Sequence, residues 1–331
     1  MDEIHKMRVI TTMKILVISS VLKDKQKNLI KATALKTGSE VHFMGSEKEI
    51  TADLQDAEII YGFGVNYART NSNLKWLCVP SAGVDYLMKP DSFANPDCLL
   101  TNSAGAYGVT IAEHIIAVSL MMMRNITDYY AASLNGKWAS PKPQKSLKDC
   151  KITVLGTGDI GTNFARRAKA FEPACITGVC RSGKADDPAY DSVIKVDDLD
   201  KILPETELLV MSLPATKETE NILSKERIEL LPDGAYIVNV GRGTAIDEDA
   251  LAEALESGRL AGAALDVFRT EPLPDNSRLW TTKNLLITPH VAGNLTLEHT
   301  LNRNVEMFCE DLENYTSGKP LKYMVDRKKG Y

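Results

Sequence analysis

The chain of 331 residues is 44% hydrophobic, 25% charged and 6% aromatic, an ordinary globular usage that argues against disordered, fibrous and membrane-embedded proteins. It contains 39 Lys and Arg residues and 44 Asp and Glu residues, which gives a formal net charge of -5. No global positive field would therefore attract nucleic acid or anionic lipid, and we expect neither a nucleic-acid partner nor a membrane. At about 100–200 residues per domain, the length predicts two domains.

The six cysteines are scattered without a C-x-x-C pair, which favours reduced thiols and a cytoplasmic location. We assign no metal-ligating residues. The longest apolar stretch, 111–123, is interrupted by Glu113 and His114 and is too short to span a bilayer. Residues 1–12 are mixed and charged, unlike a signal peptide, so we expect an extension before the first strand.

From Lys14 onward, short strand-like runs alternate with longer helical stretches, which is typical of a parallel sheet covered on both faces. Strands are predicted first at 14–19, 41–44, 58–62, 74–79 and 99–103, and then at 152–156, 176–180, 208–213, 235–240, 262–268 and 285–289. A buried helix is expected over 110–124, and a long amphipathic helix over 296–315. The pattern predicts an α/β protein with two doubly wound parallel-sheet domains.

A glycine motif, G-T-G-D-I-G, joins the predicted strand 152–156 to an alanine-rich helix. Gly156 permits a tight turn, Gly158 lets the backbone approach a pyrophosphate, and Gly161 allows close packing of helix on strand. The helix N-terminus would supply amide donors to the phosphates. Because a strand precedes the motif and a helix follows it, we predict dinucleotide binding rather than a purely structural turn.

The next strand ends in Cys-Arg-Ser-Gly-Lys (180–184), where an NAD site usually offers an acidic residue to the ribose hydroxyls. Arg181 would form charge-assisted hydrogen bonds with a 2′-phosphate, so we favour NADP(H) over NAD(H). The alternative is a solvated basic turn that tolerates NAD, and the nearby Asp186 and Asp187 keep it open.

Three further strand ends carry Arg242, Glu271 and His290, in N-V-G-R-G, D-V-F-R-T-E-P and T-P-H-V-A-G. Ligands of open α/β sheets bind beyond the carboxyl ends of the strands, so these side chains are expected at one edge. Arg242 suits a carboxylate, His290 suits acid/base catalysis, and Glu271 would fix the imidazole tautomer. Taken singly, each is more often a surface, loop or core residue; together they are better explained as a redox site.

With these motifs, the sequence resembles the D-isomer-specific 2-hydroxyacid dehydrogenase family. The resemblance covers nearly the whole chain after Met13 and is carried by SAGVD (81–85), GVTIAEH (108–114), LGTGDIG (155–161), SLPATKET (212–219), LLPDGAYIVNVGRG (230–243), AALDVFRTEPLP (263–274) and ITPHVAG (287–293).

The resemblance implies a site residue by residue. Arg242 would bind the substrate carboxylate and carbonyl, His290 would act as acid/base with Glu271 as its partner, and the backbone amides of Gly83 and Val84 would hold the carboxylate. The cofactor would contact Gly156, Gly158, Asp159, Ile160, Gly161, Arg181, Ser182, Pro214, Thr219, Val240, Asp266 and Gly293. Tyr61, with Phe63, ends a strand expected to face the substrate, although both residues could equally be packing residues.

The resemblance also implies a flavodoxin-like substrate domain, 1–104 and 296–331, split by an inserted Rossmann dinucleotide-binding domain, 105–295. It further implies a homodimer, with a contact over 110–135 whose Met-rich run would otherwise be a core helix. The function expected is reduction of a small 2-oxo acid to the D-2-hydroxy acid with NADPH, as in glyoxylate/hydroxypyruvate reductases. The alternatives are an NAD-linked D-2-hydroxyacid dehydrogenase for a larger substrate and a non-catalytic nucleotide-sensing relative.

Overall fold

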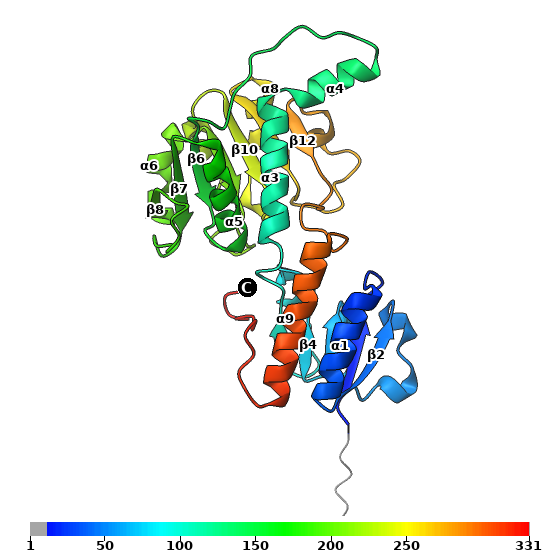
Figure 1. Cartoon of the computed structure of the whole chain (residues 1–331). Helices are drawn as coiled ribbons and strands as arrows, with labels where there is room; N and C mark the ends of the chain where they lie inside the picture. The colour runs from blue at the N-terminus through cyan, green and yellow to red at the C-terminus, as the bar shows by residue number, and fades with distance from the viewer. Residues whose placement is uncertain (1–11, 331) are drawn as a thin grey trace, which may run out of the picture. The chain divides into compact units, whose positions relative to one another are not determined.

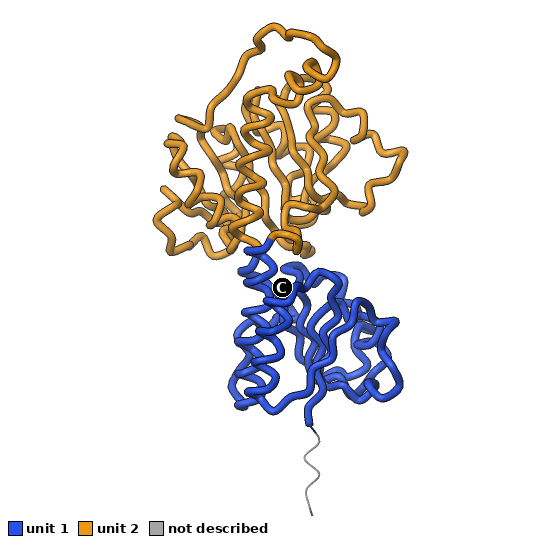
Figure 2. The backbone as a smooth tube through the Cα atoms, turned by 45° about the vertical axis from the view of Figure 1, so that its right-hand side comes forward, with its two compact units in different colours: residues 1–106, 298–331 blue, residues 107–297 orange. Residues whose placement is uncertain are grey.

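The structure, a computed structural model, describes residues 12–330. These form two compact units, coloured separately in Figure 2. The first contains the chain up to Ala106 together with the chain from Glu298 onward, and the second is Tyr107–Leu297. Apart from Thr12, the extension predicted for residues 1–12 lies outside the described residues.

The first unit is built on a five-stranded parallel sheet with the strand order β2-β1-β3-β4-β5. This is the flavodoxin-like order, which confirms the fold class predicted for this part of the chain. The strands are β1 (Lys14–Ile18), β2 (Glu40–Met44), β3 (Ile59–Gly62), β4 (Trp76–Cys78) and β5 (Leu99–Thr101). The helices are α1 (Asp24–Lys36), α2 (Val65–Thr70) and α9 (Glu298–Thr316), with the 3-10 turns η1 (Glu47–Glu49), η2 (Ala52–Leu54) and η3 (Asp85–Leu87).

Both faces of this sheet are buried, as the apolar strands require. Successive side chains of a strand point to opposite faces, so Ile15 and Val17 belong to one core and Leu16 and Ile18 to the other. The first core is closed by α1 and α9, which lie side by side in Figure 1. The second is closed by α2 and by residues of η2 and η3. The late return of the chain as α9 therefore completes the first unit.

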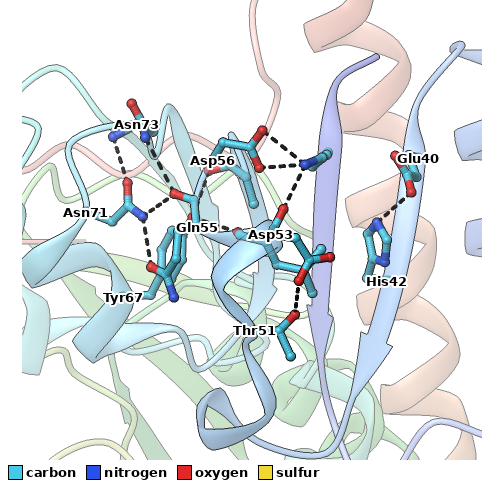
Figure 3. A network of polar contacts seen from close by, with 12 residues as sticks. Glu40, His42, Thr51, Asp53, Gln55, Asp56, Tyr67, Asn71 and Asn73 are labelled. Carbon is cyan, nitrogen blue, oxygen red and sulfur yellow. Dashed lines mark hydrogen bonds and ion pairs between the residues drawn. The ribbon is translucent and has the colours of Figure 1, made fainter. Parts of the chain in front are cut away.

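A polar network lies at the amino ends of β1 and β2 (Figure 3). The Lys14 ammonium donates to the Asp56 carboxylate at 2.7 Å and to the Asp53 carbonyl at 2.8 Å. His42 Nε2 lies 2.9 Å from Glu40 Oε1. The hydrogen bonds of Lys14 tie the connection before β3 to β1. Ligands of such sheets bind at the carboxyl ends of the strands, so this network lies at the other end of the strands.

The second unit contains a seven-stranded parallel sheet with the strand order β12-β11-β10-β9-β6-β7-β8. From β8 to β12 this follows the Rossmann order, again as predicted. The strands are β6 (Lys151–Leu155), β7 (Cys175–Cys180), β8 (Ser192–Lys195), β9 (Leu208–Met211), β10 (Ala235–Asn239), β11 (Leu260–Leu265) and β12 (Leu285–Ile287). Strand β8 was not expected, because this short edge strand has no fully buried residue and therefore no apolar run.

Helices cover both faces of the second sheet. In Figure 1, α3 and α5 lie side by side over one face, and α6, α7 and α8 contribute to the core on the other. The helices are α3 (Gly108–Met123), α4 (Ile126–Leu134), α5 (Asp159–Ala168), α6 (Leu199–Ile202), α7 (Lys225–Leu230) and α8 (Glu248–Glu256), with the 3-10 turns η4 (Lys169–Phe171), η5 (Val196–Asp198), η6 (Leu203–Glu205), η7 (Gly243–Ala245) and η8 (Arg278–Thr281).

Among the described residues, no single helix has the length and apolarity needed to cross a membrane. Only α3 and α4 taken together, bent by 70° at their junction, reach the required length and composition.

The loops that follow β10 and β11 pass each other at Gly243. A Cβ atom at this position would overlap the backbone of Phe268 and Arg269, and backbone atoms cannot move aside as a side-chain tip can. We expect Gly243→Ala to lower the free energy of unfolding by about 1–3 kcal/mol, the usual range for overpacking. Chemical denaturation measures this.

The matched control is Gly262→Ala, within β11, where the added Cβ would meet its nearest neighbours at 3.4 Å. Equal stability losses in the two variants would contradict the close passage of the two loops.

Candidate active site

The turn between β6 and α5 has distinct steric constraints at its three glycines. Gly156 has φ +105°, a conformation that residues with a Cβ rarely adopt. A Cβ on Gly161 would overlap the carbonyl of Gly156, so the helix lies directly on the turn. A Cβ on Gly158, in contrast, would meet nothing within 4 Å. The turn is therefore tight on its inner side and open at Gly158.

The side chain of Asp159 caps a neighbouring helix. Its Oδ2 accepts from the Gly108 amide, at the start of α3, at 2.7 Å, and its Oδ1 accepts from Asn163 at 2.9 Å. Burial raises the pKa of this carboxyl. The first amides of α5, which include those of Asp159 and Ile160, have no acceptor within the helix and form a site suited to anions. The turn thus fits the pyrophosphate of a dinucleotide.

A second turn, Cys180–Lys184, follows β7. Gly183 has φ +65°, and the Ser182 hydroxyl donates to the Lys184 carbonyl at 3.0 Å. Burial alone would raise the pKa of the Cys180 thiol, but hydrogen bonds from Ser182, from Thr157 and from the turn backbone outweigh burial and lower it. Arg181 and Ser182 are exposed. The turn therefore presents a guanidinium and a hydroxyl to solvent.

The loop after β9 is held together by Thr219. The Thr219 hydroxyl donates to the Pro214 carbonyl at 2.7 Å and accepts from the Thr216 amide at 2.9 Å. Hydrogen bonds from its own backbone and from Thr216 lower the pKa of Glu218, and the positive charge of Arg181 adds to this effect. The Arg181 side chain therefore lies near this loop, as the predicted cofactor residues Pro214 and Thr219 require.

Arg242 occupies the turn after β10. The Asn239 side chain closes this turn: its amide donates to the Arg242 carbonyl and its oxygen accepts from the Gly241 amide, each at 3.0 Å. The guanidinium Nη1 donates to the Gly241 carbonyl at 2.9 Å. Val240, which lies between Asn239 and Gly241 in the chain, is buried. A buried asparagine therefore sets the backbone from which Arg242 extends.

Glu271 and His290 are brought together as the sequence predicts. The imidazole Nδ1 lies 2.7 Å from Glu271 Oε2, and Glu271 Oε1 accepts from the Phe268 amide at 2.9 Å. The histidine side chain remains 51% exposed. With its proton on Nδ1 directed to the carboxylate, the ring presents Nε2 as the atom that can exchange a proton with a ligand.

Asp266 has a role that the sequence did not indicate. The residue is 2% exposed, and its carboxylate accepts from the Thr288 hydroxyl at 2.6 Å and from the Val291 and Ala292 amides at 2.9 and 3.0 Å. These groups surround His290. The sequence shows that Thr288 lies close to His290 along the chain. It does not reveal that Thr288 contacts Asp266, which is 22 residues away.

Gly293 packs against α3. A Cβ at this position would lie 2.8 Å from the Tyr107 ring and 2.9 Å from Ile111. In the structure its contacts are thus with the helix, and its predicted cofactor contact stays a prediction.

Asn102 holds the loop of the first unit that carries Gly83 and Val84, the residues predicted to bind substrate. The Asn102 side chain donates to the Ala82 carbonyl at 2.6 Å, and the Asn102 amide donates to the Tyr323 carbonyl at 3.3 Å. The Ser81 hydroxyl donates to the Gly83 carbonyl at 2.9 Å. Val84 is buried. The loop that carries the Gly83 and Val84 amides is therefore braced by the segment after α9.

Tyr61 does not have the position expected of a substrate contact. Its side chain is 1% exposed, and its ring packs on Phe308 with centroids 4.7 Å apart. Strand β3 is buried on both faces, so alternation along the strand does not turn Tyr61 outward. Phe63, just beyond the strand, is 48% exposed and is the aromatic residue that is accessible here.

No group of three or more His, Cys, Asp or Glu side chains within residues 12–330 is placed to bind a metal ion.

Comparison with known proteins gives the family. Residues 116–292 match the family model of the D-isomer specific 2-hydroxyacid dehydrogenase, NAD binding domain. A glyoxylate/hydroxypyruvate reductase A of Salmonella paratyphi C is 31% identical over 266 residues, covering 78% of this chain and 82% of the relative.

Solved structures agree with this match. A D-isomer specific 2-hydroxyacid dehydrogenase from Xanthobacter autotrophicus, in complex with NADPH and MES, has a TM-score of 0.81 at 28% identity. An NADPH-dependent glyoxylate/hydroxypyruvate reductase from Sinorhizobium meliloti, in complex with NADP and sulfate, has a TM-score of 0.80 at 25% identity. Each similarity covers 97% of this chain and 100% of the other. The chain belongs to the D-isomer specific 2-hydroxyacid dehydrogenase family.

Proposed function

We propose that the protein reduces a small 2-oxo acid, such as glyoxylate or hydroxypyruvate, to the D-2-hydroxy acid with NADPH. The observation that carries this proposal is the His290–Glu271 pair, 2.7 Å apart, in the same unit as the glycine turn after β6. The Salmonella and Sinorhizobium relatives, which are glyoxylate/hydroxypyruvate reductases, support the substrate class. The site is that of an oxidoreductase.

The mechanism follows from the positions of the side chains. When bound, NADPH supplies the hydride. The Arg242 guanidinium binds the substrate carboxylate and polarises the carbonyl, and the Gly83 and Val84 amides contribute further donors to the carboxylate. His290 donates its Nε2 proton to the carbonyl oxygen, which becomes the hydroxyl. Glu271 orients the ring through its contact with Nδ1.

The cofactor site we propose uses the turns already described. The glycine turn, with Gly156, Gly158, Asp159, Ile160 and Gly161, holds the pyrophosphate. Arg181 and Ser182 hold the 2′-phosphate, since a guanidinium and a hydroxyl suit a phosphate where a carboxylate would repel it. Two relatives of known structure, from Xanthobacter and Sinorhizobium, are complexes with NADPH or NADP. The remaining contacts are assigned to Pro214, Thr219, Val240, Asp266 and Gly293.

We assign the substrate domain to 1–104 and 296–331 and the dinucleotide-binding domain to 105–295, which also supplies Arg242, Glu271 and His290 to the substrate site. We also propose that the protein acts in the cytoplasm, since all six cysteines are free thiols and such thiols persist in a reducing compartment.

Two copies of the chain are proposed to associate through α4. Ile126, Tyr130 and Leu134 repeat every four residues and so share one face of this helix. They are 47%, 65% and 69% exposed, and Trp138, beyond the helix, is fully exposed. In α3, by contrast, Val118, Ser119 and Met123 of the Met-rich run are buried within the unit. The exposed contact surface is therefore that of α4 rather than that of the whole 110–135 segment.

The acid/base role is tested with His290→Gln. We expect kcat for glyoxylate reduction to fall by about 10²–10⁴-fold, the usual contribution of a general acid, with the dissociation constant for NADPH unchanged. Steady-state kinetics and fluorescence titration measure the two quantities. The control, His42→Gln, changes a histidine of β2 in the first unit. A normal kcat in His290→Gln would refute the assignment.

The phosphate site is tested with Arg181→Ala. Loss of the guanidinium should raise KM for NADPH by about tenfold or more, because hydrogen bonds between charged groups contribute about 1.5–3 kcal/mol, and KM for NADH should change by less than about twofold. Lys148→Ala, which removes a cation before the amino end of β6, is the control. An equal rise for both cofactors would count against the 2′-phosphate contact.

The dimer is tested with the double variant Tyr130→Glu/Leu134→Glu. Charges on the apolar face of α4 should shift the protein from dimer to monomer in analytical ultracentrifugation. Leu35→Glu, at an 83% exposed leucine of α1, should leave the dimer intact. A wild-type protein that sediments as a monomer, or a double variant that remains dimeric, would exclude this contact.

A further inference from the structure

The segment Thr288–Ala292, which carries His290, is organised around the single buried residue Asp266. The His290 amide donates to the Asp266 backbone carbonyl at 2.9 Å. The next two amides, of Val291 and Ala292, donate to the two carboxylate oxygens, Oδ1 and Oδ2. Three consecutive backbone amides thus converge on one residue, an arrangement that binds anionic groups in proteins.

The backbone of His290 lies in the left-handed region, with φ +52°. A residue with a Cβ is strained in such a conformation, and the surrounding structure must compensate. The amides that converge on Asp266 supply this compensation, since hydrogen bonds to a buried carboxylate are stronger than those to neutral acceptors. The two amides that follow His290 thus depend on the position of this carboxylate.

The side-chain hydroxyl of Thr288 provides a hydrogen bond that orients the Asp266 carboxylate. Its Oγ1 donates to Asp266 Oδ1 at 2.6 Å, and His114 Nε2 of α3 lies 3.4 Å from the same hydroxyl. Of the four hydrogen bonds described to the carboxylate and carbonyl of Asp266, this is the only one that a side-chain substitution can remove without changing the backbone.

We propose that Thr288 is a positioning residue for His290. Its hydroxyl fixes the Asp266 carboxylate so that the Val291 and Ala292 amides hold the backbone after His290 in place, and this keeps the left-handed conformation of His290 and sets Nδ1 against Glu271. Thr288 touches neither the substrate nor the reacting atoms. The inference rests on the proposed function to the extent that His290 is taken as the acid/base.

The test compares Thr288→Val, which keeps the shape of the side chain and removes the hydroxyl, with Thr288→Ser, which keeps the hydroxyl. In Thr288→Val, we expect kcat for 2-oxo acid reduction to fall about tenfold or more. Thr288→Ser should restore kcat. Thr282→Val is the control, because Thr282 is a buried threonine whose hydroxyl donates to a local carbonyl, that of Arg278, whereas Thr288 is partly buried.

A second readout does not depend on turnover. In protein labelled with ¹⁵N-histidine, the Nδ1–H signal of His290, identified by its absence in His290→Gln, should report the hydrogen bond to Glu271. We expect this signal to shift or broaden in Thr288→Val and to persist in Thr288→Ser and Thr282→Val. Thr288→Ala replaces Thr288→Val should the latter fail to fold.

The outcomes separate the two proposals. An unchanged kcat and an unchanged His290 signal in Thr288→Val would overturn the positioning role and leave the proposed function intact. A wild-type protein that reduces no 2-oxo acid with NADPH would overturn the proposed function, while the nuclear magnetic resonance comparison would still decide the role of Thr288. A fall in kcat that Thr288→Ser fails to restore would also count against the hydroxyl.

Discussion

The need to satisfy one buried carboxylate, that of Asp266, is the constraint on which the candidate site depends. A carboxylate that is 2% exposed is stable only when protein donors replace the lost water. The donors that lie within reach are the Thr288 hydroxyl and the amides that follow His290. The path of this loop thus follows from the need for hydrogen bonds to Asp266. The direction of the imidazole follows from the path of the loop.

Close approach of backbones is the second condition. In a parallel sheet, the loops after all strands crowd at one edge, and in the second unit they can do so only where side chains are absent. Gly161 lies on the carbonyl of Gly156, and Gly243 lies on the backbone that leads from β11 to Glu271. Gly158, whose side is open, is the position that we propose for the approach of the cofactor. The same residue type therefore serves packing at two positions and access at the third.

The distribution of charge explains how a chain of net charge -5 can take anionic ligands. Arg181 lies near the loop after β9, where it contributes to lowering the pKa of Glu218, and Arg242 extends from a turn that Asn239 closes. Each cation is held locally by neighbours within the second unit. In the proposed function, a substrate carboxylate and a cofactor phosphate would depend on these local groups rather than on the overall field of the protein.

Much of the fold was predictable, because periodicity reports burial. The apolar runs of β1, β6 or β10 are buried on both faces, and only parallel sheets with helices on both sides require this. Strand β8 could not be found in this way, since none of its residues is fully buried. Tyr61 was expected to face the substrate, yet a strand buried on both faces gives no outward direction, and its ring packs on Phe308 of α9.

The sequence by itself determined the fold class, the glycine turn, the candidate trio and the family, because each depends on residue type at short spacing. Only the tertiary structure decided what holds these residues in place. Asn102 braces the loop of Gly83 across 20 residues, and Asp266 reaches Thr288 across 22. Such contacts leave no periodic trace in the chain, because they are made by single hydrogen bonds between loops that only the folded sheet brings together.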